Sequence, residues 1–263
     1  SLSWFNLSAS KKPHVRAQAG EKIKQRRLFL EGLEDRTLMA VFEWKAVATD
    51  TNWNTAGNWT QLSGVDVGAD GVPNGGDDVQ FNQTTSNFLT PTLASPITLG
   101  NLSFTGASTG FNVTGSTLTV NTANTYNSTG NNTISSVLTG ASGLTKNNTG
   151  TLTLASTNSY TGTTAINNGT IISTATNALG TGAVTMGTVG GIAQSGTVGT
   201  LDLSNASQTS ISLTVASDSN SSNNILIGSG RTLTINATTA NSVVVGVDPI
   251  SATINSITKL VVS

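Results

Sequence analysis

The sequence predicts an all-β fold and, within that class, a single-stranded, right-handed parallel β-helix, or β-solenoid. Residues 143–171 (GLTKNNTGTLTLASTNSYTGTTAINNGTI) alternate short Thr-, Leu- and Ile-rich stretches with Gly and Asn turns. Apolar residues at every second position, bounded by turn residues, are typical of strands rather than helices. One such coil cannot bury its apolar face alone, so further coils must stack on it. This pattern predicts a function carried by shape and surface rather than by a catalytic cluster.

The composition supports this fold and narrows the chemistry. Charged residues make up 10% of the 263 residues and aromatic residues 5%, whereas an average soluble protein has about 25% charged residues. The chain contains no cysteine, which excludes disulfides, thiolate metal sites and a cysteine nucleophile. The one histidine, His14, lies in a basic N-terminal arm, which argues against His-based catalysis and a classical zinc site. We therefore expect no cofactor.

Residues 1–40 form the basic arm. They hold eight of the twelve Lys and Arg residues and four of the thirteen acids, so the arm carries +4 and the rest of the chain −5. Opposite charges favour docking, within one molecule or between neighbours. Only residues 20–35 have the apolar spacing of a helix, so the arm is expected to be partly helical at most. We expect the arm to insert into a second copy through an apolar and cationic set of residues: Ile23, Arg26, Arg27, Leu28, Leu30 and Leu33.

Other roles for the arm are less well supported. Nucleic acid is not an expected partner, because basic and aromatic residues are not interleaved on a folded surface. No run of the chain approaches the roughly 18 apolar residues of a membrane helix. Leu28–Leu30 is too short for the apolar core of a signal peptide. The main alternative to docking is a solvated processing arm.

Residues 41–88 are predicted to form a Trp-rich cap with the first strands. Trp44, Trp53 and Trp59 are three of the four tryptophans, and they lie beside Gly and Asn turns. A cap would cover apolar side chains and unpaired backbone at one end of a solenoid. Trp53 and Trp59 would be core residues of this cap or, alternatively, would stack on surface carbohydrate.

Residues 89–263 are predicted to be solenoid rungs, with strands such as GTLTLAS and GTLDLSN. Branched residues suit the strands, and Gly and Asn suit the corners. The spacing of these units is irregular, so no fixed rung length is assigned. The segment INSITKLVVS ends on an apolar strand, and Leu260, Val261 and Val262 are candidate assembly residues. Either another chain continues this sheet, or the sequence is trimmed here, or the last strand folds back.

Two motifs carry a resemblance to known exported proteins. FEWKAVATDTNWNTAGNWTQ and GVPNGGDDVQFN (residues 42–61 and 71–82) resemble the opening of bacterial proteins with the autotransporter-associated β-strand repeat. Residues 143–171, followed by NALGTGAVTM, resemble the repeat itself. The chain departs from that repeat at residues 147–149, where Gly-rich residues are common, and at Thr163, where a second Gly is usual.

A second resemblance lies in LFLEGLEDRTLMA, residues 28–40. This segment is similar to a short N-terminal signature of exported planctomycete proteins. Neither family has catalytic residues to transfer to this chain. The two resemblances imply export, a parallel β-helix and a cell-surface or extracellular location.

Carboxylates are the one enzyme-like feature. Asp77 and Asp78 are adjacent, and Asp66 and Asp70 precede them in a Gly-rich loop. Glycoside hydrolysis requires two carboxyl groups about 5–10 Å apart, but adjacent strand residues point to opposite faces. The four aspartates could instead ligate calcium, although they lack a calcium-loop pattern, or cap turns.

The expected function is therefore a non-enzymatic, extracellular structural protein that assembles with itself into a fibre or surface layer. One alternative is an adhesin-like module that binds carbohydrate through the Trp-rich cap. A second alternative is a polysaccharide-acting β-helix enzyme.

Overall fold

The computed structural model describes residues 38–66, 68–189, 192–193, 198–215, 223–235, 243–245 and 261–262. The chain divides into two units, Ser1–Arg36 and Thr37–Ser263. All of the described residues belong to the second unit, and the fold below is the fold of that unit.

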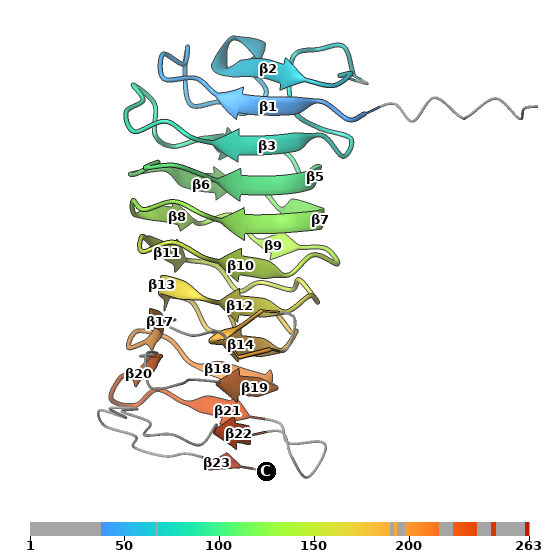
Figure 1. The fold of residues 1–263 in the computed structure, drawn as a ribbon. Coiled ribbons are helices and arrows are strands. Elements are labelled where there is room, and N and C mark those ends of the chain that lie inside the picture. The colour runs from blue at the N-terminus through green and yellow to red at the C-terminus, as the bar shows by residue number, and fades with distance from the viewer. Residues whose placement is uncertain are drawn as a thin grey trace, which may run out of the picture. The chain divides into compact units, whose positions relative to one another are not determined.

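The described residues confirm the predicted fold class. They form a β-solenoid in which nearly every strand pair is parallel (Figure 1). The only regular helical element described is a single 3-10 turn, η1 (Ala56–Asn58). Most parallel partners lie about 20–30 residues apart, as between Leu144 and Thr164 or Val184 and Leu213. This is the arrangement expected when a chain coils and each coil stacks on the last.

Two sheets run along the solenoid, and a third begins in its C-terminal part. The largest sheet follows the order β2–β1–β3–β5–β7–β10–β12–β14–β19–β22, with β9 also paired to β7. Its strands are β1 (Val41–Trp44), β2 (Trp59–Ser63), β3 (Asp78–Phe81), β5 (Ile97–Phe104), β7 (Leu118–Tyr126), β9 (Leu138–Thr139), β10 (Leu144–Lys146), β12 (Thr164–Ile166), β14 (Val184–Met186), β19 (Leu213–Val215) and β22 (Val243–Val245).

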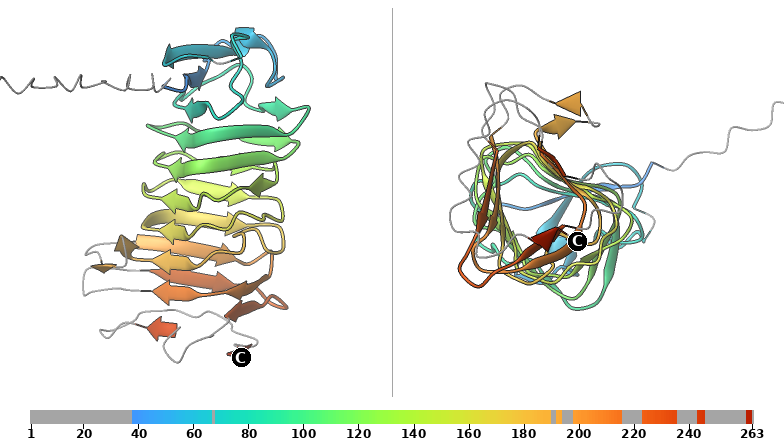
Figure 2. Two further views of the ribbon diagram at one scale, coloured as in Figure 1. Left: turned by 90° about the vertical axis from the view of Figure 1, so that its right-hand side faces the viewer. Right: turned by 90° about the horizontal axis from the view of Figure 1, so that it is seen from below.

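The second and third sheets complete the coils. The second sheet consists of β4 (Thr92–Leu93), β6 (Asn112–Gly115), β8 (Asn132–Ile134), β11 (Thr151–Leu154), β13 (Asn168–Ser173), β17 (Val198–Leu203) and β20 (Asn224–Ile227). The third consists of β18 (Gln208–Ile211), β21 (Leu233–Ile235) and β23 (Val261–Val262). Viewed along its axis, the chain winds around an enclosed interior (Figure 2).

The central coils have a nearly constant length, which the sequence spacing did not reveal. Leu144 pairs with Thr164, and Thr164 pairs with Val184, so each of these coils takes 20 residues. The next coil is longer, because Val184 pairs with Leu213. The extra length includes an antiparallel pair, β15 (Thr188–Val189) with β16 (Ile192–Ala193). Insertions at the corners therefore hide a regular ladder from simple periodicity.

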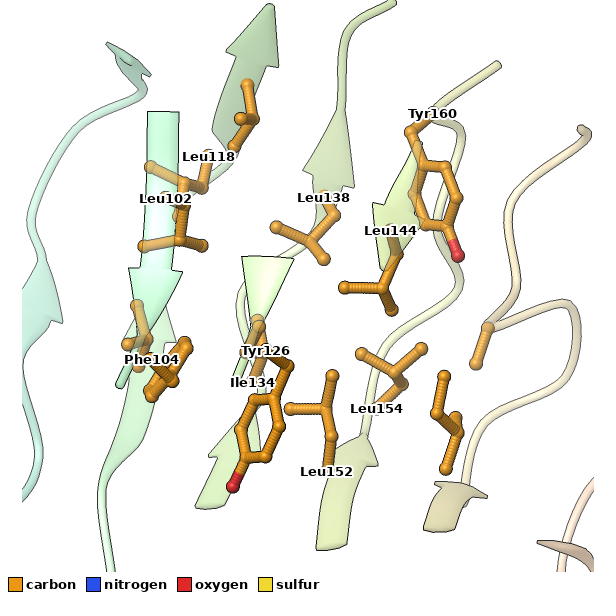
Figure 3. Close-up of a cluster of buried hydrophobic side chains, with 14 of the residues drawn as sticks. Leu102, Phe104, Leu118, Tyr126, Ile134, Leu138, Leu144, Leu152, Leu154 and Tyr160 are labelled. Carbon is orange, nitrogen blue, oxygen red and sulfur yellow. The ribbon is translucent and has the colours of Figure 1, made fainter. Parts of the chain in front are cut away.

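Side chains alternate between the interior and the outer surface along each strand. β11 is typical: Leu152 and Leu154 are fully buried, while Thr151 and Thr153 are partly exposed. This is the pattern that Thr-Leu-Thr-Leu predicts for a strand with one face on a core. The interior of each coil is filled by such side chains from the facing sheets, including Leu138, Leu144 and Leu152 (Figure 3).

Glycines occupy corners where consecutive coils approach closely. A Cβ atom on Gly150 would lie well inside 3.0 Å of the carbonyl oxygen of Gly130 in the preceding coil. A Cβ atom on Gly162 would meet the backbone of Gly143 in the same way. These two positions need glycine for the space it leaves, which permits neighbouring backbones to stack.

Candidate functional sites

The Trp-rich segment packs its rings inward at the N-terminal end of the largest sheet. Trp44 and Trp53 are 0% exposed and Trp59 is 3% exposed. Each indole N–H donates to a backbone oxygen: Trp44 to Phe88 (3.0 Å), Trp53 to Pro73 (3.1 Å) and Trp59 to Trp53 (2.7 Å). Because Trp53 and Trp59 are buried, their ring faces are not available to stack on a sugar. The structure therefore supports the interpretation that Trp53 and Trp59 are core residues of the cap.

An aromatic column continues from this cluster into the solenoid. Phe81 stacks on Phe104 with ring centroids 4.9 Å apart, and the ring centroids of Phe104 and Tyr126 are 5.3 Å apart. These residues occupy the same register position in β3, β5 and β7. Figure 3 shows Phe104 and Tyr126 on neighbouring strands with their rings in the interior. Such contacts stabilise consecutive coils beyond the area that they bury.

The adjacent aspartates of β3 and its preceding loop do not face one substrate. Asp77 is buried and accepts hydrogen bonds from the backbone N–H groups of Ala40 (3.1 Å) and Asn74 (3.2 Å). Asp78 instead accepts from the backbone N–H (2.8 Å) and the side-chain amide (2.7 Å) of Asn101. Burial raises the pKa of Asp77, although the two backbone donors act in the opposite direction.

The upstream aspartates hold the Gly-rich loop. Asp66 accepts from the N–H groups of Ala69 (3.1 Å) and Gly71 (2.8 Å), and Asp70 accepts from Val72 (3.0 Å). Carboxylates that accept backbone N–H groups two to five residues ahead stabilise turns. Within the described ranges, no group of three or more His, Cys, Asp or Glu residues is placed to hold a metal ion.

Lys146 is an interior residue that the sequence reasoning missed. It is 0% exposed and lies 5.0 Å above the ring of Tyr126. Its Nζ donates to the carbonyl oxygens of Asn148 and Asn168 (3.1 Å for the latter). No ion pair joins it to a carboxylate among the residues that the structure describes. The alternation Leu-Thr-Lys in β10 was the available signal, since Leu144 and Lys146 share a face.

Burial sets the electrostatics of this interior pair. Burial of the amine lowers the pKa of Lys146 to about 8. Burial also raises the pKa of Tyr126 to about 12, although hydrogen bonds from neighbours such as Asn132 act to lower it. The ring of Tyr126 offers its negative face to the amine, which is a favourable cation–π arrangement.

Side-chain amides join consecutive coils where the strand ladders break. Asn158 is buried, accepts from the N–H of Leu138 (2.8 Å) and donates to the carbonyl of Ala178 (2.7 Å). These three residues are spaced by one coil each. Gln208 binds the preceding coil at a later corner, where it accepts from the N–H of Leu179 (3.1 Å) and donates to the carbonyl of Gly180 (3.4 Å). Buried backbone groups at the corners are thereby satisfied without a strand partner.

A second set of amides forms a ladder along the axis. The side chain of Asn147 donates to that of Asn127 (2.6 Å), and the side chain of Asn167 donates to that of Asn147 (2.8 Å). Asn147 is one of the positions where the chain departs from the Gly-rich pattern of the repeat it resembles. The departure therefore supplies side-chain bonds between coils.

Most of the predicted assembly residues lie outside the described residues. This holds for the arm residues Ile23, Arg26, Arg27, Leu28, Leu30 and Leu33, and for Leu260. Val261 and Val262 form β23, which pairs in parallel with β21. The structure therefore leaves the role of these residues in assembly as a prediction. Among the described residues, no helix is both long and apolar enough to span a membrane.

Comparison with known proteins identifies one repeat. Residues 144–172 match the model of the passenger-associated-transport-repeat family. No curated protein and no solved structure matches the chain. The match covers β10, β11, β12 and most of β13, which are consecutive strands of the two main sheets. Together with the solenoid, it fits the autotransporter-associated β-strand repeat and suggests an exported, passenger-type domain.

Proposed function

We propose that the protein is a non-enzymatic structural component of a cell surface or extracellular layer, and that its solenoids associate end to end. The observation that carries this proposal is the use of polar groups inside the fold. Asp66, Asp77 and Asp78 bind backbone groups, and Asn158 and Lys146 bind carbonyls of neighbouring coils. These five side chains are thus used to hold coils and turns together.

The charge distribution supports association between copies. Residues 41–88 contain six acids and one base, a net charge of −5, whereas residues 89–263 contain three of each and are neutral overall. The acidic charge of the body is therefore concentrated in the Trp-rich cap. The arm of one copy, at +4, would be attracted to the cap of a neighbouring copy, and salt would weaken that attraction.

Sedimentation velocity over a range of protein concentrations tests this proposal. The full chain should grow in mass with concentration, and a variant lacking residues 1–36 should remain a folded monomer. The deletion stops at residue 36 because the carbonyl of Leu38 accepts from Val65 (2.8 Å) and the N–H of Ala40 donates to Asp77. Equal assembly of the truncated chain would refute the role of the arm. A full chain that stays monomeric would refute self-association altogether.

A further inference from the structure

The N-terminal end of the largest sheet has a closed core but an unpaired edge. β2 is the outermost strand at this end and pairs only with β1 among the described strands (Figure 1). Trp59 is buried, but the four residues from Thr60 to Ser63 are exposed. The cap thus protects the apolar interior, while the outer side of β2 pairs with no strand among the described residues.

This edge lacks most of the features that block strand addition. The sequence of β2, WTQLS, has no charged residue and no proline, although natural edge strands commonly use both to prevent pairing. The pairing of β2 with β1 shifts register by a bulge between Val41 and Phe42, so only a short part of β2 is regularly paired. Apolar side chains surround it: Leu62 is 49% exposed, Val65 52% and Leu38 71%.

Charge indicates which partner fits this edge. A second cap would bring two regions of −5 together, so a symmetric cap-to-cap pair is electrostatically unfavourable. The other end of the same sheet is β22, which pairs only with β19 among the described strands. The solenoid beyond residue 88 has no net charge. Joining β2 to β22 would continue one sheet from copy to copy without that repulsion.

We infer that the exposed edge of β2 receives β22 from a second copy of this chain, forming a head-to-tail junction. The inference rests on the proposed end-to-end association and names one of its surfaces. Because β1 and β22 run in the same sense and β2 runs opposite to β1, the junction is antiparallel. Backbone hydrogen bonds would give the junction its affinity. A heterologous contact that repeats without closing gives a filament.

The test introduces charges on the edge of the full-length chain. The double variant T60K/L62K places two lysines on the exposed part of β2, where neither side chain fills the core. Val198→Lys is the matched control, because Val198 is 47% exposed but lies on β17, a strand of the second sheet that takes no part in the β2–β22 junction. Circular dichroism and thermal melts should show that both variants fold like the wild type.

Sedimentation velocity then separates the outcomes. The wild type and V198K should assemble with rising concentration, whereas T60K/L62K should stay at the monomer mass of 26.8 kDa. Assembly of T60K/L62K equal to that of the wild type would overturn the β2 junction while leaving self-association standing. A wild type that stops at a dimer would overturn the head-to-tail arrangement in favour of a symmetric pair. A monomeric wild type would overturn the proposed association and this inference together.

Discussion

Replacing Lys146 with methionine should change how the stability of the solenoid depends on pH. Methionine keeps an unbranched side chain in the interior and removes the titrating amine. In the wild type, burial lowers the pKa of this amine from 10.5 to about 8. Between these values the unfolded chain binds more protons than the folded chain, so wild-type stability must rise with pH.

The size of the effect follows from the shift in the pKa of Lys146. One pKa unit corresponds to about 1.4 kcal/mol, so the shift amounts to roughly 3.5 kcal/mol in total, of which about 2.5 kcal/mol falls between pH 7 and pH 10. Above about pH 10 tyrosines ionise in the unfolded chain, and the raised pKa values of Tyr126 and Tyr160 then lower stability. The informative window therefore ends near pH 10.

Urea unfolding followed by circular dichroism at several pH values measures this difference. The free energy of unfolding of the wild type should increase relative to that of K146M by roughly 2.5 kcal/mol from pH 7 to pH 10. Because both proteins contain the same tyrosines, the difference reports mainly Lys146. Curves that run parallel within about 0.5 kcal/mol would refute the burial of the Lys146 amine, since a solvent-exposed lysine has no such slope.

Substitutions of two kinds, at corner glycines and at a buried asparagine, test the stacking of the coils. Gly150→Ala and Gly162→Ala should each lower the free energy of unfolding by about 3 kcal/mol, because the added Cβ would collide with backbone of the preceding coil. Gly68→Ala is the control. A Cβ on Gly68 would meet only side-chain atoms 3.3 Å or more away, so this change should cost less than about 1 kcal/mol. Equal melting temperatures for all three would contradict the close corners. Asn158→Ala should cost about 2–3 kcal/mol, because it leaves the N–H of Leu138 and the carbonyl of Ala178 buried without their partner. Exposed Asn121 is the control for this change, and if Asn121→Ala proves as costly in chemical denaturation, the amide bridge has no special role.

The strands of the solenoid could be predicted from the sequence because one pattern, the burial of every second side chain, dominates them. In Thr151–Leu154 every second side chain is buried, and a period of two is decisive for a strand against a core. The coil length was not readable. Strand pairs 20 residues apart are interrupted by corners of variable length, such as the one containing β15 and β16. Corner geometry depends on contacts with the next coil, which a local pattern does not contain.

The candidate sites were less predictable for a related reason. Lys146 shares the interior face with Leu144, but a lysine is ordinarily assigned to the surface. Its burial depends on carbonyls of Asn148 and Asn168, and Asn168 lies one coil away. The exposed edge of β2 was also hidden, because WTQLS reads as an ordinary strand until its pairing with β1 alone is known. The tryptophans were easier, since a cluster of large aromatic residues beside turns indicates a local core.

Electron microscopy of the purified full-length protein tests the central claim most directly. An end-to-end structural solenoid should appear as filaments that lengthen as the protein concentration rises. T60K/L62K, prepared in parallel, should give only separate particles, and V198K should give filaments like the wild type. Wild-type grids that contain only separate single-solenoid particles at every concentration would contradict the account.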